Sequence, residues 1–132
     1  MGRITVDIYH ILEKNGDSPL IAYGRRGAPD GLNTWKFGGK PDMAKHVLAT
    51  FFKGEHGFSS AGQTRKLIRK IEDWDPDVIH LHNIHGFVLQ TELLFSYLKK
   101  AGKPVVWTLH DCWPYTGHCA FYDYTGCEGW KS

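Results

Sequence analysis

The chain has 132 residues, of which 42% are hydrophobic and 23% are charged, and its formal net charge is +2. Five Trp, six Tyr and seven Phe provide large side chains for a core, as expected for one ordinary globular domain. The small net charge gives no indication of nucleic-acid binding, and no apolar run approaches the roughly 20 residues that a membrane-spanning helix needs.

The first half of the chain is predicted to contain two helices and two short strands. Apolar residues recur at helical spacing over residues 4–12, and Asn15-Gly16 ends that pattern. Short apolar runs at residues 20–23 and, more weakly, 34–37 predict strands. A second helical stripe covers residues 44–52.

The second half repeats this alternation of helix and strand. Helical stripes cover residues 67–74, ended by Asp75-Pro76, and residues 93–101, followed by Gly102; strands are predicted at residues 78–82 and 105–109. Strands that are apolar on both faces and alternate with helices predict an α/β fold, namely a Rossmann-like doubly wound parallel sheet with helices on both sides. Because no strand precedes the first helix, we expect the chain to be an internal piece of a longer protein.

Histidines stand at the ends of two predicted strands. The first strand continues into His80-Leu-His82-Asn83, with His85 shortly after it, and the second ends in His110-Asp111. Side chains alternate along a strand, so His80 and His82 share one face. Ligands bind at the carboxyl ends of parallel strands, so we expect His82 and His110 to converge on one rim that lines a binding cleft. A histidine there could donate to or accept from a sugar hydroxyl.

Two metal-binding interpretations remain open. The spacing of His80, His82 and His85 is that of dinuclear zinc hydrolases of the metallo-β-lactamase family, but Ile84 stands where that motif needs an Asp. With His110 added, this cluster defines one alternative, a zinc-dependent hydrolase. Tetrahedral zinc ligation in a non-catalytic binding module is the other, and its candidate ligands are Cys112, His118, Cys119 and Cys127. Without a close Cys-x2-Cys pair, reduced and inert thiols are the default.

Gly2-Arg3 opens the first predicted helix. The free backbone N–H groups and the helix dipole at such a terminus favour an anionic ligand. An ordinary helix start explains the same two residues equally well.

Two long runs carry a family resemblance. Residues 75–86 read DPDVIHLHNIHG and residues 103–120 read KPVVWTLHDCWPYTGHCA. They resemble bacterial glycosyltransferases of family 4, of the capsular and exopolysaccharide type, and the resemblance covers essentially the whole chain. It implies a GT-B architecture of two Rossmann-like domains, in which residues 1–132 form the amino-terminal, acceptor-side domain without its first strand and without the carboxyl-terminal donor domain.

The resemblance also implies an activity and a set of roles. The expected reaction is a retaining transfer from a nucleotide-sugar donor to a glycan or lipid-linked acceptor in surface polysaccharide biosynthesis, without a metal or other cofactor. It implies a cytoplasmic enzyme, working at the inner face of the plasma membrane through peripheral association of the full-length protein. This chain alone is expected to be inactive. The implied roles are catalytic for His110 and Asp111, donor binding for Gly2, Arg3 and His110, and acceptor binding for His82, Asn83, His85 and Gly86.

Overall fold

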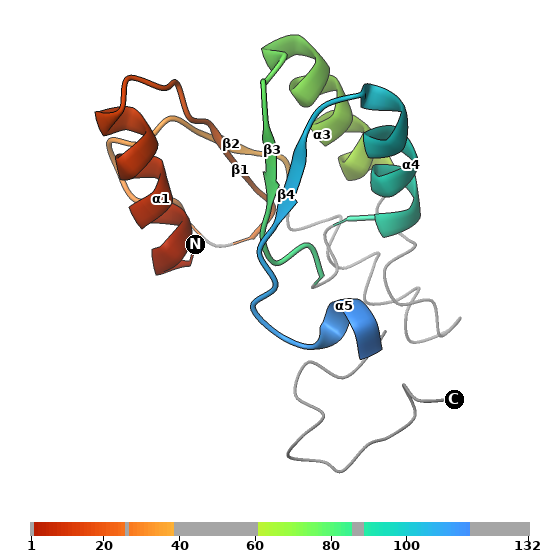
Figure 1. Ribbon diagram of the computed structural model, residues 1–132. Helices are drawn as coiled ribbons and strands as arrows, with labels where there is room; N and C mark the ends of the chain where they lie inside the picture. The colour runs from red at the N-terminus through yellow and green to blue at the C-terminus, as the bar shows by residue number, and fades with distance from the viewer. Residues whose placement is uncertain (1, 26, 39–60, 86–88, 117–132) are drawn as a thin grey trace.

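The computed structural model describes residues 2–25, 27–38, 61–85 and 89–116. Helices and short strands follow one another along these residues, with β1 and β2 in succession and alternation from α3 onward (Figure 1). They are α1 (Arg3–Lys14), β1 (Ile21–Tyr23), β2 (Thr34–Lys36), α3 (Ala61–Trp74), β3 (Ile79–Leu81), α4 (Thr91–Ala101), β4 (Val105–Trp107) and α5 (Trp113–Thr116). The predicted helix over residues 44–52 lies outside the described residues. Within the described part, none of the helices combines the length and the apolar character needed to cross a membrane.

The four strands of the described residues form two separate parallel pairs. Ile21 of β1 aligns with Thr34 of β2, and Ile79 of β3 aligns with Val105 of β4. The prediction of parallel strands in an α/β arrangement is therefore confirmed. The prediction of one continuous sheet is not met in the described residues, because no strand there hydrogen-bonds to both pairs.

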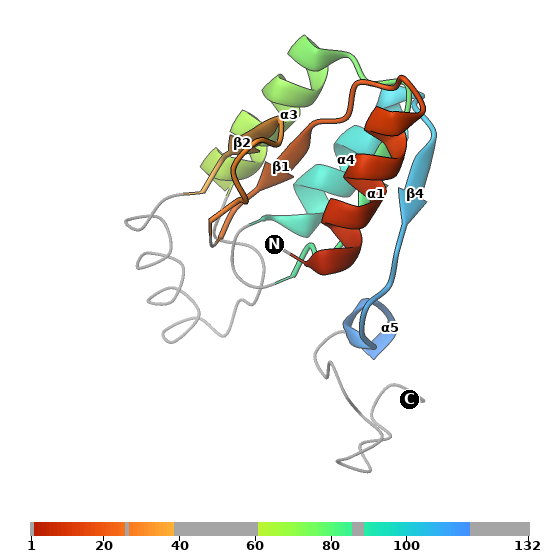
Figure 2. The same cartoon turned by 90° about the vertical axis from the view of Figure 1, so that its left-hand side faces the viewer.

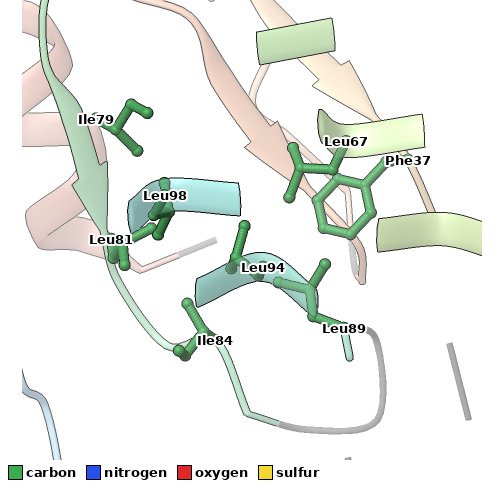
Figure 3. Packing of buried hydrophobic residues seen from close by; sticks show 8 residues of the cluster. All are labelled: Phe37, Leu67, Ile79, Leu81, Ile84, Leu89, Leu94 and Leu98. Atoms are coloured by element: carbon green, nitrogen blue, oxygen red, sulfur yellow. The ribbon is translucent and has the colours of Figure 1, made fainter. Parts of the chain in front are cut away.

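The hydrophobic core lies between the β3–β4 pair and the helices α3 and α4. Leu94 of α4 is its most deeply buried member, with 1% of its surface exposed. Figure 3 shows how side chains of β3, α3 and α4 meet there, and Trp107 of β4 packs against them. The buried cluster consists of Phe37, Leu67, Ile79, Leu81, Ile84, Leu89, Leu94 and Leu98. This packing fixes β3 and β4 against a rigid layer, so their carboxyl ends are held in place.

The opposite face of the β3–β4 pair is not sealed. Helix α1 lies on that side of the pair (Figures 1 and 2). Ile4 and Ile11 of α1 nevertheless expose 52% and 60% of their surface, and Val106 of β4 exposes 49%. The buried residue of α1 is Tyr9, whose hydroxyl accepts a 2.9 Å hydrogen bond from the backbone N–H of Asn33, next to β2. The predicted burial of strands on both faces is thus found on one face only.

The predicted helix stops are confirmed for α3, which precedes β3, and for α4, which precedes β4. Helix α3 ends at Trp74, and the next residue, Asp75, adopts a left-handed conformation with φ of 49° and donates its backbone N–H to the carbonyl of Ile71. The carboxylate of Asp75 also accepts a hydrogen bond from the ammonium of Lys103, just before β4. Gly102 ends α4 in the left-handed region, with φ of 64°, where glycine carries no steric penalty.

Candidate functional site

The carboxyl ends of β3 and β4 bring two histidines into direct contact. His80 aligns with Val106 in the parallel register, and alternation then places His82, Thr108 and His110 on that same face. Nδ1 of His82 lies 2.9 Å from Nε2 of His110, within hydrogen-bond distance. The convergence of the two strand ends predicted from the sequence is therefore present in the structure.

A second contact lies one step back along the same two strands. Nε2 of His80 lies 2.8 Å from the hydroxyl of Thr108. The His80 ring also packs against the His82 ring, with 4.3 Å between the ring centroids. We call His80, His82, Thr108 and His110 together the histidine rim. Its three imidazoles form a continuous row on the open face of the β3–β4 pair.

The histidine rim keeps its central imidazole neutral. Burial of the ring, with further contributions from His80 and His110, lowers the pKa of His82 from 6.5 to about 4. Burial disfavours the charged imidazolium, and each neighbouring imidazole would repel a second positive charge. At neutral pH, His82 therefore offers one N–H and one lone pair and carries no charge.

Asp111 holds the two loops that flank the rim. One carboxylate oxygen, Oδ1, accepts the backbone N–H of Trp113 at 3.1 Å, at the start of α5. The other, Oδ2, lies 3.2 Å from Nε2 of His85, in the loop after β3. The His85 ring stacks on Trp113 with 5.3 Å between ring centroids. Asp111 therefore acts on the conformation of the site, since both of its oxygens are used within the protein.

Of the remaining residues predicted to bind the acceptor, the structure describes Asn83 and His85. Asn83 is exposed and follows the rim directly. Its neighbour Ile84 is buried in the core, which anchors this loop. His85 is half-buried and its ring is directed toward Asp111, so this residue helps to hold the loop that follows β3. Gly86 lies outside the described residues.

Gly2 and Arg3 lie at the start of α1. Gly2 is the N-cap in an extended conformation, and the Arg3 side chain is 94% exposed with its Nε 3.8 Å from Asp7. Helix α1 begins at the same end of the molecule as the carboxyl ends of β3 and β4 (Figures 1 and 2). The two residues are thus on the expected side, and their donor-binding role stays a prediction.

The described residues contain no group of three or more His, Cys, Asp or Glu side chains arranged to hold a metal ion. Of the four histidines of the zinc-hydrolase alternative, His85 is directed to Asp111 rather than to the rim. Cys112 is a half-buried free thiol. The other ligands of the binding-module alternative, His118, Cys119 and Cys127, lie outside the described residues.

Sequence reasoning gave no role to Thr108 or Trp113. Thr108 directly follows β4, and its hydroxyl contacts His80 on the neighbouring strand β3. That contact depends on the register of β3 against β4, which the sequence does not specify. Trp113 stacks on His85, and Asp111 contacts both residues, through the backbone N–H of Trp113 and Nε2 of His85.

Comparison with known proteins gives one family. The sequence model of Glycosyltransferase Family 4 matches residues 1–128. The chain is also similar to the putative colanic acid biosynthesis glycosyl transferase WcaC of Escherichia coli (strain K12), with 45% identity over 62 residues. That match covers 43% of this chain and 15% of the relative, and no solved structure matches significantly. Because the family match spans nearly the whole sequence, the chain belongs to Glycosyltransferase Family 4.

Proposed function

We propose that this chain is the acceptor-side domain of a retaining glycosyltransferase of GT-B architecture. The complete enzyme moves a sugar from a nucleotide-sugar donor to a glycan or lipid-linked acceptor in surface polysaccharide synthesis. Family membership and the polysaccharide pathway in the relative's name support this proposal. The observation that carries it is the 2.9 Å contact between His82 and His110, at the carboxyl ends of two parallel strands.

The chemistry of transfer suits uncharged hydrogen-bonding groups at this rim. A retaining transfer develops positive charge on the sugar and negative charge on the departing diphosphate. Neutral imidazoles orient sugar hydroxyls without placing a fixed cation beside the positive centre, and His82 stays neutral at pH 7 because its pKa is lowered to about 4. His110 would then contact the donor sugar near the reacting carbon, while Asp111 holds its loop.

The other proposed contacts surround this centre. Asn83, His85 and Gly86 would line the acceptor side of the cleft. Gly2 and Arg3, at the start of α1, would face the donor diphosphate, because free backbone N–H groups at a helix N-terminus favour an anion. No metal or other cofactor takes part in the proposed step. A lipid-linked acceptor would place the complete cytoplasmic enzyme at the inner face of the plasma membrane.

The test is His110→Ala in the complete transferase, with transfer of labelled sugar from a panel of nucleotide sugars to a membrane lipid fraction as the assay. We expect a loss of about 10²-fold, the scale found when a transition-state hydrogen bond is removed. His10→Ala is the matched control, because His10 lies on α1 and contacts Glu13. A His110→Ala rate within about twofold of wild type, roughly 0.4 kcal/mol in barrier height, would remove His110 from the mechanism.

A further inference from the structure

The histidine rim is a chain of contacts that begins at a hydroxyl. The Thr108 hydroxyl lies 2.8 Å from Nε2 of His80. The His80 ring packs on the His82 ring at 4.3 Å with 32° between their planes. His82 in turn meets His110 through ring nitrogens 2.9 Å apart. Each member thus restricts the ring orientation of the next.

A hydrogen bond between two ring nitrogens needs one N–H and one lone pair. When Nε2 of His110 donates, Nδ1 of His82 must be unprotonated, and when the donor is His82, Nε2 of His110 must be unprotonated. In either case the contact occupies Nε2 of His110, so Nδ1 is the ring nitrogen of His110 that remains to contact a ligand. The protonation of that Nδ1 is therefore coupled to the tautomer of His82 for as long as the contact forms, and the contact forms only while the His82 ring keeps its orientation.

The Thr108 hydroxyl is well suited to hold the ring of His80 by a hydrogen bond. A threonine hydroxyl can both donate and accept, so it matches either neutral tautomer of His80. The backbone N–H of Thr108 also donates to the carbonyl of Leu81 at 2.9 Å, which fixes Thr108 beside β3. The hydroxyl is thus supplied from a rigid point of the sheet.

We propose that Thr108 and His80 are positioning residues that hold the ring of His82, so that His110 presents a single tautomer to the reacting sugar. His82 then acts through His110 in addition to its proposed role at the acceptor side. The effect on transfer depends on the proposed function, whereas the effect on the His110 tautomer does not.

The variants that separate the hydroxyl from the shape of the side chain are Thr108→Val and Thr108→Ser. Valine keeps the branched shape and suits a strand, so the fold should persist, and serine keeps the hydroxyl. The probe is the ¹⁵N chemical shift of the histidine ring nitrogens in the 132-residue chain at pH 7. We expect one dominant His110 tautomer in the wild type and in Thr108→Ser, and a mixture of tautomers in Thr108→Val.

In the complete transferase, Thr108→Val should lower kcat by about tenfold with the acceptor KM within twofold, because misorientation near the reacting centre affects the transition state. Thr108→Ser should restore kcat. Unchanged His110 nitrogen shifts in Thr108→Val, or equal damage from Thr108→Ser, would overturn the positioning role. If His110→Ala leaves transfer intact while Thr108→Val still mixes the tautomers, the proposed role of His110 in transfer fails and the positioning of its ring by Thr108 and His80 stands.

Discussion

His82 and His110 are 28 residues apart in the chain, yet their ring nitrogens Nδ1 and Nε2 lie 2.9 Å from each other. The contact is possible because β3 and β4 run parallel in register and end at the same edge. Packing against α3 and α4 on the opposite face holds both strands in place. The two imidazoles therefore form one unit, and its behaviour can be measured in several independent ways.

Acid should destabilise the fold through His82. The pKa of His82 is lowered to about 4 in the folded state by burial and by His80 and His110, against 6.5 in the unfolded chain. The unfolded state therefore binds the proton first as the pH falls. This contribution to stability is fully present above pH 6.5 and is lost as the pH falls toward 4. Urea unfolding at a series of pH values from 7.5 to about 4 measures how the free energy of unfolding depends on pH.

His82→Gln is the variant that isolates this effect, since glutamine cannot titrate in that range. We expect its free energy of unfolding to depend less on pH than that of the wild type between pH 6.5 and 4. The His10→Gln control should keep the wild-type dependence, because His10 is an exposed residue of α1. Equal slopes in the wild type and His82→Gln would show that His82 titrates normally.

Removal of the Asp111 carboxylate should loosen both loops at the rim. Asp111→Ala leaves the Trp113 N–H and Nε2 of His85 without their partner, and we expect a loss of about 1–3 kcal/mol in the free energy of unfolding. Asp111→Asn keeps an oxygen for Trp113 and should cost less. The exposed Asp17→Ala should stay within about 0.5 kcal/mol of wild type in the same denaturation experiment. A loss as small in Asp111→Ala as in Asp17→Ala would contradict this account.

Metal analysis distinguishes the transferase proposal from the two metal-binding alternatives. We expect the purified 132-residue chain to contain less than stoichiometric zinc, and chelation to leave transfer by the complete enzyme unchanged. Stoichiometric zinc that is lost in His82→Ala would favour the hydrolase. Zinc that is retained in His82→Ala but lost in Cys119→Ala would favour the binding module.

The sequence predicts the elements of this fold better than their assembly. Periodicity and stop signals place α1, α3 and α4, and Asp75 and Gly102 end their helices as predicted. These are local properties of the chain. The separation of the strands into two pairs depends on hydrogen bonds between distant segments, which periodicity does not encode. The exposure of Ile4 and Ile11 on α1 likewise depends on what packs against that helix.

For the candidate site, the sequence likewise predicts which residues lie near each other but not which individual contacts they make. Alternation along each strand predicts that His80 and His82 share a face, and parallel strands predict that His110 lies near them. The pairing of His82 with His110, and of His80 with Thr108, follows from the strand register. The use of both Asp111 oxygens depends on the turn into α5, a short helix that hydrophobic periodicity does not predict.

The most direct measurement is a double-mutant cycle on sugar transfer by the complete enzyme, with His82→Gln, His110→Ala and the two combined. Residues that act through one hydrogen bond give strongly non-additive losses. We predict that the double variant transfers sugar about as slowly as His110→Ala alone. Losses that simply multiply, or a His82→Gln enzyme as fast as wild type, would show that the two strand ends do not form one reaction centre.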